Sequence, residues 1–197
     1  IDVVLDTDTY NEIDDQFALA YLLKSSPMLR TQAVYAAPFS DPSRRFGNFK
    51  SDAPAYGMEK SYCEILKILS LCGREDLSAC VFRGSPRYLA DERTPVESAA
   101  ALDLAQRAMS YTPEHPLYVV GIAAATDIAS ALLLKPAIRD RIVVVWLGGN
   151  AHTWPHNLEF NSSQDIAAAR VLFNSGVPLV QLPCMGVVSA FTTSGPE

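Results

Sequence analysis

The sequence has little positive charge and no long basic run. Its 197 residues include 16 Lys and Arg against 22 Asp and Glu, a formal net charge of −6, and the densest basic cluster is Arg44, Arg45 and Lys50. Nucleic-acid phosphates are bound by continuous basic surfaces, so we expect no nucleic-acid partner. Long apolar runs are also missing, because stretches such as 142–149 fall far short of the roughly 20 residues that cross a bilayer. We therefore expect no membrane association.

Cysteine is scarce as well. The four cysteines, Cys63, Cys72, Cys80 and Cys184, lie far apart and form no CxxC pair. This spacing favours buried, reduced thiols over a zinc site or a disulfide framework, and it makes a cytoplasmic location the default. In contrast, 49% of the residues are hydrophobic, which is enough to fill a sizeable core and excludes a disordered chain.

Short β-rich runs alternate with longer amphipathic ones along the whole chain. The predicted strands are 2–5, 32–36, 79–82, 117–122, 142–147 and 178–182, and the predicted helices are 14–24, 54–71, 95–109, 127–134 and 164–174. Parallel strands need crossover connections and are buried on both faces. The pattern therefore predicts an α/β fold in which a mainly parallel central sheet carries helices on both faces, as a single domain over residues 1–197.

Proline and glycine mark the expected helix ends. Pro54 and Pro95 suit the first turns of their helices, and Gly73 and Gly176 suit the stops that follow two others. Residues 38–53 are rich in Pro, Gly, Ser and charge and are expected to form a long loop beside the mouth of the sheet, either a solvated connector or a lid.

Acidic residues crowd the end of the first predicted strand. Six acids lie between residues 2 and 15, and the first basic side chain after them is Lys24. Two explanations remain open. Asp14 and Asp15 could charge the first turn of a helix while Asp6 and Asp8 end a strand in solvent. Alternatively, Asp6 and Asp8 point the same way along an extended chain and meet Asp14 or Asp15 around a hard divalent cation.

Three segments together resemble the nucleoside hydrolases, a family that cleaves the N-glycosidic bond of ribonucleosides with a bound calcium ion. The first, 6–15 (DTDTYNEIDD), is similar to the family's DxDPGxDD motif, with two residues inserted and the Pro-Gly absent. The second pairs the glycine turn 147–149 with the Glu-Phe-Asn segment 159–161, and the third is 165–179. The resemblance covers essentially the whole chain and implies the Rossmann-like nucleoside hydrolase fold.

The resemblance also implies a metal site and a catalytic base. Asp8 and Asp15 are expected to bind Ca²⁺ together with a backbone carbonyl near Ile122. Asp8 is further expected to accept a proton from the attacking water.

Other residues are implied to bind the nucleoside. Asp14, Glu159 and Asn161 are expected to hold the ribose hydroxyls, and Asp6 is expected to order the loop. The family further implies purine or pyrimidine nucleosides as small-molecule substrates, a role in nucleotide salvage, and a homo-oligomer, either a dimer or a tetramer.

The sequence departs from the family at two places. A late His and Asp, implicated in leaving-group protonation and calcium binding, come from a segment beyond the glycine turn, and this sequence ends at Glu197 before such a segment. We therefore expect a domain that is incomplete at its C-terminus. An Asn that follows the second strand in the family is replaced by the segment 37–40 (APFS).

The segment 151–161 contains further candidates. Trp154 either stacks on the nucleobase or anchors its loop on the core. His152 and His156 are either surface residues or candidate general acids.

Two other functions compete with nucleoside hydrolysis. Phosphohydrolases of the haloacid dehalogenase type also carry an Asp-x-Asp after the first strand, and Asp6 would be their nucleophile, but Tyr10 stands where they have Thr or Val. The remaining alternative is a domain that binds calcium or a ribosyl ligand without turnover.

Overall fold

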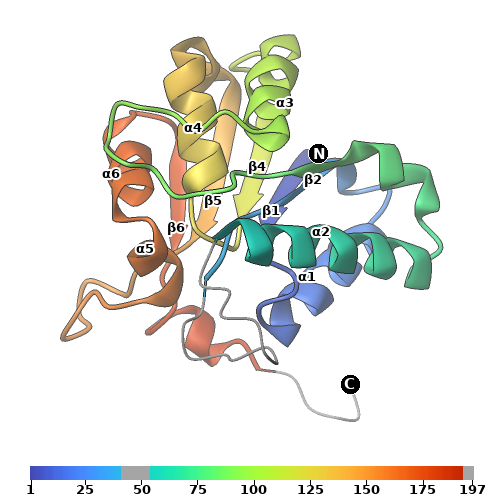
Figure 1. Ribbon diagram of the computed structural model, residues 1–197, viewed down its shortest axis with the longest axis horizontal. Coiled ribbons are helices and arrows are strands. Elements are labelled where there is room, and N and C mark those ends of the chain that lie inside the picture. Colours follow the sequence, from blue (N-terminus) through green and yellow to red (C-terminus); the bar gives the residue numbers. More distant parts are fainter. Residues whose placement is uncertain (41–53, 193–197) are drawn as a thin grey trace.

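The computed structural model describes residues 1–40 and 54–192, and its centre is a parallel sheet (Figure 1). The strands are β1 (Asp2–Thr7), β2 (Arg30–Ala36), β3 (Val81–Arg83), β4 (Leu117–Gly121), β5 (Ile142–Leu147) and β6 (Leu179–Leu182). They pair in the order β3-β2-β1-β4-β5-β6, and every pairing is parallel. The predicted α/β class is confirmed.

Helices cover both faces of this sheet (Figure 1). They are α1 (Ile13–Lys24), α2 (Pro54–Leu71), α3 (Ala99–Arg107), α4 (Thr126–Leu134), α5 (Phe160–Gln164) and α6 (Ile166–Asn174). One buried cluster joins α1 and α2 to the face that carries Val3 and Leu5, and the other joins α3, α4 and α6 to the face that carries Val4 and Val144. Strand side chains alternate between the faces, so Ile142, Val144 and Trp146 of β5 are buried in the second cluster, while the residues between them are half-buried on the other face.

The chain adds strands first on one side of β1 and then on its other side. The chain moves from β1 through β2 to β3 on one side, then returns to β4 on the other side of β1. Asp6 therefore pairs with Tyr35 of β2 and with Gly121 of β4 at the carboxyl end of the sheet. Open α/β sheets bind ligands in the crevice that forms at such a switch point.

Several predicted boundaries hold and others are wrong. Pro54 begins α2, and Gly73 and Gly176, with φ of 66° and 76°, follow the ends of α2 and α6 as predicted. The helix predicted from Pro95 instead begins at Ala99, because Ser98 accepts the backbone N–H of Ala101 and caps it there. The helix predicted over 164–174 is broken at residue 165 into α5 and α6.

Other expectations concern the surface. All four cysteines are free, as predicted, but the expectation that they are buried is wrong: Cys63 is exposed on α2 and the other three are half-buried. Among the described helices, none is long and apolar enough to cross a membrane. Most of the predicted loop, 41–53, lies outside the described residues, as does the basic cluster at 44–50.

Candidate active site at the carboxyl end of the central strand

Two carboxylates are buried where β1 ends. Asp6 and Asp8 are each 1% exposed, so the explanation in which they end a strand in solvent is wrong. Thr7 lies between them, and its hydroxyl donates a hydrogen bond to Asp15 Oδ1. This contact holds Asp15, which is 7% exposed, at the start of α1 close to Asp8, whereas Asp14 is exposed. The structure thus selects Asp15 and not Asp14 as the third buried acid.

Asn11 shapes the turn that carries Asp8. Its backbone N–H donates to the Asp8 carbonyl at 2.7 Å, and its side-chain Nδ2 donates to Asp8 Oδ2 at 2.9 Å. Burial raises the pKa of Asp8 to about 7, although the hydrogen bond from Asn11 opposes the shift. Asn11 lies between Asp8 and Asp14, in the part of the segment that departs from the family motif. The sequence did not predict this role, because the Asn11 side chain can contact Asp8, three residues earlier, only when the chain forms a turn between them.

The three buried carboxylates affect one another. Burial raises the pKa of Asp15 well above its usual value, and the charge of Asp8 raises it further. The pKa of Asp6 is also raised well above its usual value, mainly by burial and then by neighbouring carboxylates, Asp127 first. Neither carboxylate oxygen of Asp6 has a hydrogen-bond partner. Such a cluster is unfavourable unless positive charge balances it.

Asp127 is a fourth buried acid that sequence reasoning missed. Its Oδ1 accepts from the backbone N–H and hydroxyl of Ser85, at 2.8 and 2.7 Å, and from the hydroxyl of Ser98 at 2.8 Å. A Cβ on Gly84 would lie 2.2 Å from its Oδ2, so only glycine fits there. Burial raises the pKa of Asp127 to about 6. The sequence held one signal for this residue: Asp127 lies in the first turn of the helix that follows a buried strand, where ligand-binding residues of α/β sheets are found.

Glu159 and Asn161 form the opposite side of the site, above β4 and β5. Glu159 caps α5: its carboxylate accepts the backbone N–H groups of Asn161 and Ser162 at 3.0 and 2.9 Å. It also accepts the N–H of Gly149 at 2.8 Å, in a turn where Gly149 has a φ of 69°. Asn161 Nδ2 donates to the carbonyl oxygens of Ile122 and Leu147 at 3.1 and 3.0 Å.

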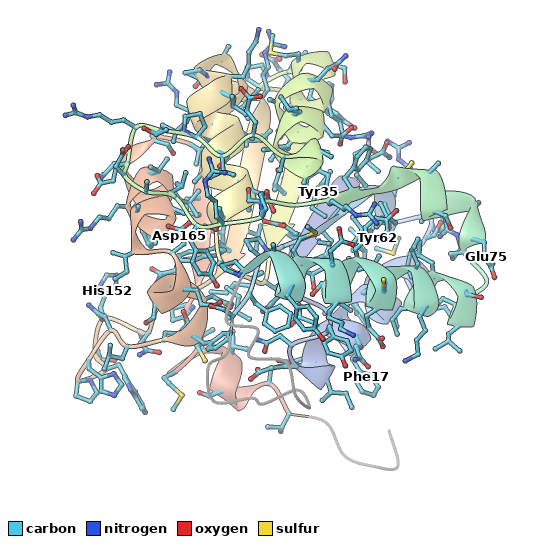
Figure 2. The ribbon with its side chains drawn as sticks, in the orientation of Figure 1. Phe17, Tyr35, Tyr62, Glu75, His152 and Asp165 are labelled. Atoms are coloured by element: carbon cyan, nitrogen blue, oxygen red, sulfur yellow. The ribbon has the colours of Figure 1, made fainter. Side chains whose placement is uncertain are left out.

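The predicted site residues therefore fall into two groups. Asp8, which follows β1, and Asp15, in the first turn of α1, come together. Asn161 is bonded directly to the Ile122 carbonyl, the backbone group predicted to bind calcium. Trp154 is half-buried, while His152 and His156 are exposed, and Figure 2 shows His152 at the outer edge of the segment between β5 and α5. That placement gives the general-acid role of the histidines no support.

The described part of the chain contains no group of three or more His, Cys, Asp or Glu side chains that could hold a metal ion. What it offers instead is a pair of buried carboxylates, Asp8 and Asp15, with the backbone carbonyl of Ile122 as the third predicted ligand. All of these donors are oxygens, which hard cations such as Ca²⁺ prefer.

Comparison with known families supports the earlier resemblance. The sequence model of the inosine-uridine preferring nucleoside hydrolase family matches residues 50–194. A curated relative from Shigella boydii, which carries the name pyrimidine-specific ribonucleoside hydrolase RihB, is 39% identical over 67 residues. Those residues are 32% of this chain and 28% of the relative. The family match begins after the acidic segment, so Asp8 and Asp15 lie outside it, whereas Glu159 and Asn161 lie within it.

Solved structures resemble most of this chain. A purine-preferring ribonucleoside hydrolase from Gardnerella vaginalis has a TM-score of 0.70 at 23% identity, over 92% of this chain and 60% of that one. The type III effector protein XopQ, complexed with adenosine diphosphate ribose, has a TM-score of 0.68 at 20% identity, over 93% of this chain and 58% of its own. At these identities the likeness shows the fold. This chain covers only about three fifths of each of those structures.

Proposed function

Since the chain belongs to the inosine-uridine preferring nucleoside hydrolase family, we propose that it hydrolyses the N-glycosidic bond of ribonucleosides to free base and ribose. The observation that carries this proposal is the set of buried carboxylates at the carboxyl end of β1, Asp8 and Asp15 above all. Glycosidic bond cleavage develops positive charge on the sugar, and fixed negative groups beside it stabilise that transition state.

Calcium is the cofactor that these residues fit best. Asp6 has two buried oxygens without partners beside Asp8 and Asp15. Burial raises the pKa values of Asp8 and Asp15, and a bound cation would oppose that shift. We propose that Asp8, Asp15 and the carbonyl of Ile122 hold the ion. When bound, calcium supplies positive charge that lowers the pKa of a neighbouring water molecule.

Asp8 is the proposed general base. Its Oδ2 accepts the hydrogen bond from Asn11 Nδ2, which fixes the orientation of the carboxylate and leaves Oδ1 to accept a proton from the attacking water. The short turn closed by Asn11 keeps this carboxylate buried, away from bulk water. Removal of a proton from water makes the oxygen a better nucleophile toward the anomeric carbon.

The ribose is proposed to bind to Asn161, Glu159 and Asp14. Both hydrogens of Asn161 Nδ2 are used on backbone carbonyls, so Oδ1 is the atom that remains to accept a ribose hydroxyl. Glu159 is held by three backbone N–H groups and still has lone pairs for a hydroxyl proton. Asp14 lies exposed in the first turn of α1, and Trp154 remains the proposed surface for the nucleobase.

The activity is tested by incubating the chain with uridine, cytidine, inosine and adenosine in the presence of Ca²⁺. Chromatography should detect free base, and a reducing-sugar assay should detect an equal amount of ribose. Addition of a chelator is expected to stop both, and re-added Ca²⁺ to restore them. Release of ribose phosphate, or hydrolysis that persists in the chelator, would contradict the proposed mechanism.

Metal binding can be measured without turnover. We expect isothermal titration calorimetry to show one Ca²⁺ site, and Asp15→Asn to weaken it at least about tenfold, because the variant loses one of the two carboxylates proposed to bind the ion. Asp140→Asn is the matched control, since Asp140 is an exposed acid that pairs with Arg139 away from the sheet's carboxyl edge. Equal affinities for the wild type and Asp15→Asn would reject this ligand assignment.

A homo-oligomer is part of the same proposal. Helix α1 exposes Ile13, Phe17 and Tyr21 at helical spacing, with Phe17 69% exposed on its outer side (Figure 2). The first turn of α1 is acidic and Lys24 lies in its last turn, so a second copy packed antiparallel would pair opposite charges. Light scattering should give a multiple of the chain mass, reduced by Phe17→Asp but not by Leu102→Asp on α3. An unchanged mass in Phe17→Asp would exclude this interface.

We also propose a role in nucleoside salvage and a cytoplasmic location. The four free cysteines fit a reducing compartment. The phosphohydrolase alternative loses support, because the sequence model that matches residues 50–194 is that of a nucleoside hydrolase family. Binding of a ribosyl ligand without turnover stays a second candidate, favoured by the structural neighbour that holds adenosine diphosphate ribose. A chain that binds Ca²⁺ and adenosine diphosphate ribose but releases no ribose from nucleosides would establish it.

A further inference from the structure

A hydrogen-bonded group of three residues, Ser40, Tyr88 and Gln164, lies at the carboxyl end of the sheet and has no part in the proposed mechanism. We call it the polar bridge. Its centre is the side chain of Gln164, the last residue of α5. Gln164 Oε1 accepts the backbone N–H of Ser40 at 2.8 Å and the hydroxyl of Tyr88. The hydroxyl oxygens of Ser40 and Tyr88 lie 3.2 Å apart. The bridge thus connects the segments that follow β2, β3 and β5.

The sheet order places this bridge at the same end of the sheet as the proposed active site. Strands β2 and β5 are separated by β1 and β4, so a contact between Ser40 and Gln164 crosses the carboxyl ends of the two central strands. Those ends carry Asp8 and Ile122. Asn161, three residues before Gln164 on α5, is bonded to the Ile122 carbonyl. The charge of Asp8 also contributes, after burial, to raising the pKa of Tyr88 to about 12.

The orientation of the Gln164 carboxamide is fixed by chemistry. A backbone N–H only donates, so the amide oxygen and not the nitrogen must face Ser40. Rotation of the amide by half a turn would set two donors against each other. The nitrogen, Nε2, therefore points away from Ser40, and it is a buried donor with no hydrogen-bond partner. Buried donors are rarely left without an acceptor, because the loss of their hydration is not compensated.

We propose that Gln164 Nε2 is a substrate-recognition donor that binds an acceptor oxygen of the nucleoside. This inference rests on the proposed function. A ribonucleoside offers two kinds of acceptor oxygen, the sugar hydroxyls and a carbonyl of the base, and either would satisfy the amide. The contacts with Ser40 and Tyr88 hold the donor in place before the substrate arrives, so little ordering is needed on binding.

The test compares substrates as well as variants. Gln164→Met keeps the length of the side chain and removes the donor, and it is expected to lower kcat/KM about tenfold for inosine and uridine. The substrate set adds 2′-, 3′- and 5′-deoxyinosine, which each lack one sugar hydroxyl, and purine riboside, which lacks the base carbonyl. The analogue that lacks the bound oxygen should be poorer with the wild type and insensitive to Gln164→Met, which identifies the source of the acceptor.

Two further variants separate recognition from support of the fold. Tyr88→Phe removes a donor to Gln164 Oε1 but leaves Nε2 in place, so it should affect all substrates by the same factor. Gln32→Met alters an amide that donates to Asp2 near the amino ends of β1 and β2, and it should leave kcat/KM unchanged for every substrate. Melting temperatures of all variants show whether any of them perturbs the fold.

The outcomes distinguish this inference from the proposed function. If the wild type hydrolyses nucleosides and Gln164→Met slows every substrate and analogue equally, the recognition role is overturned and the function stands. If the wild type hydrolyses no nucleoside, the function is overturned, and the same substrate series is then compared by affinity in titration calorimetry. Loss of affinity in Gln164→Met for all but one analogue supports recognition, and equal affinities, or no measurable affinity in the wild type, overturn it.

Discussion

Replacement of Asp8 by Asn is expected to lower kcat/KM for nucleoside hydrolysis by about 10³-fold or more, with the fold unchanged. General base catalysis contributes about 10²- to 10⁴-fold, and an amide accepts no proton near neutral pH. The variant also removes one of two buried charges proposed to hold calcium, so both effects act together. The structure is expected to persist because Asn can still accept the hydrogen bond that Asn11 Nδ2 donates at 2.9 Å.

The matched control is Asp6→Asn. Asp6 lies near the end of β1, two residues before Asp8, and is just as buried, yet it has no proposed contact with the substrate. Its replacement is expected to change kcat/KM by less than about tenfold. Initial rates with uridine and inosine, and circular dichroism of each variant, check both expectations. Loss of hydrolysis in Asp6→Asn together with full activity in Asp8→Asn would remove Asp8 from the mechanism.

Replacement of Trp146 by Ala is expected to lower the free energy of unfolding by about 3–5 kcal/mol, the range for a large aromatic removed from a core. Trp146 is fully buried in β5, its Nε1 donates to the Ala123 carbonyl at 3.0 Å, and its ring meets the edge of Phe173. A Cβ on Gly148 would lie 2.3 Å from the ring, so the indole also packs against the turn that precedes Gly149. Its loss leaves a cavity directly behind the site.

Urea unfolding followed by far-UV circular dichroism measures this effect without relying on tryptophan fluorescence. Trp146→Phe keeps an aromatic ring but leaves the Ala123 carbonyl without its donor, so a smaller loss of about 1–3 kcal/mol is expected. Trp154→Ala is the surface control, because Trp154 is only half-buried and its loss leaves a smaller cavity. Equal losses in Trp146→Ala and Trp154→Ala would contradict the core role of Trp146.

The elements that the sequence predicts best are those with strong local signals. Helix α2 and strand β5 have the predicted bounds because proline, periodicity and an apolar run each define them within a few residues. The predicted bounds are wrong where a capping residue or a contact with a distant segment determines where an element begins. The helix expected from Pro95 starts late, because Ser98 caps it and the N–H of Val96 bonds to Ser130 on α4. Cys63, expected to be buried, is exposed because it lies on a face of α2 that does not meet the sheet.

The acidic segment shows the same division. The sequence alone established that negative charge is concentrated at the end of the first strand and that the whole resembles a nucleoside hydrolase. It could not assign each acid. Asp2 pairs with Arg30 and Tyr111 at the other end of β1, away from the candidate site. Asp14 is exposed on α1, and Asp127 joins the cluster from the first turn of α4, more than a hundred residues away.

The sequence by itself therefore determined the α/β architecture, the family and the chemical character of the site, since repeated patterns and motifs encode these locally. Only the tertiary structure decided which carboxylates are buried together, that Asn11 orients Asp8, and that Gln164 bonds to Ser40 while its Nε2 stays an unpaired donor. The physical reason is that burial and hydrogen-bond partnership depend on strand order. The order β2-β1-β4-β5 brings together segments that the chain itself keeps far apart.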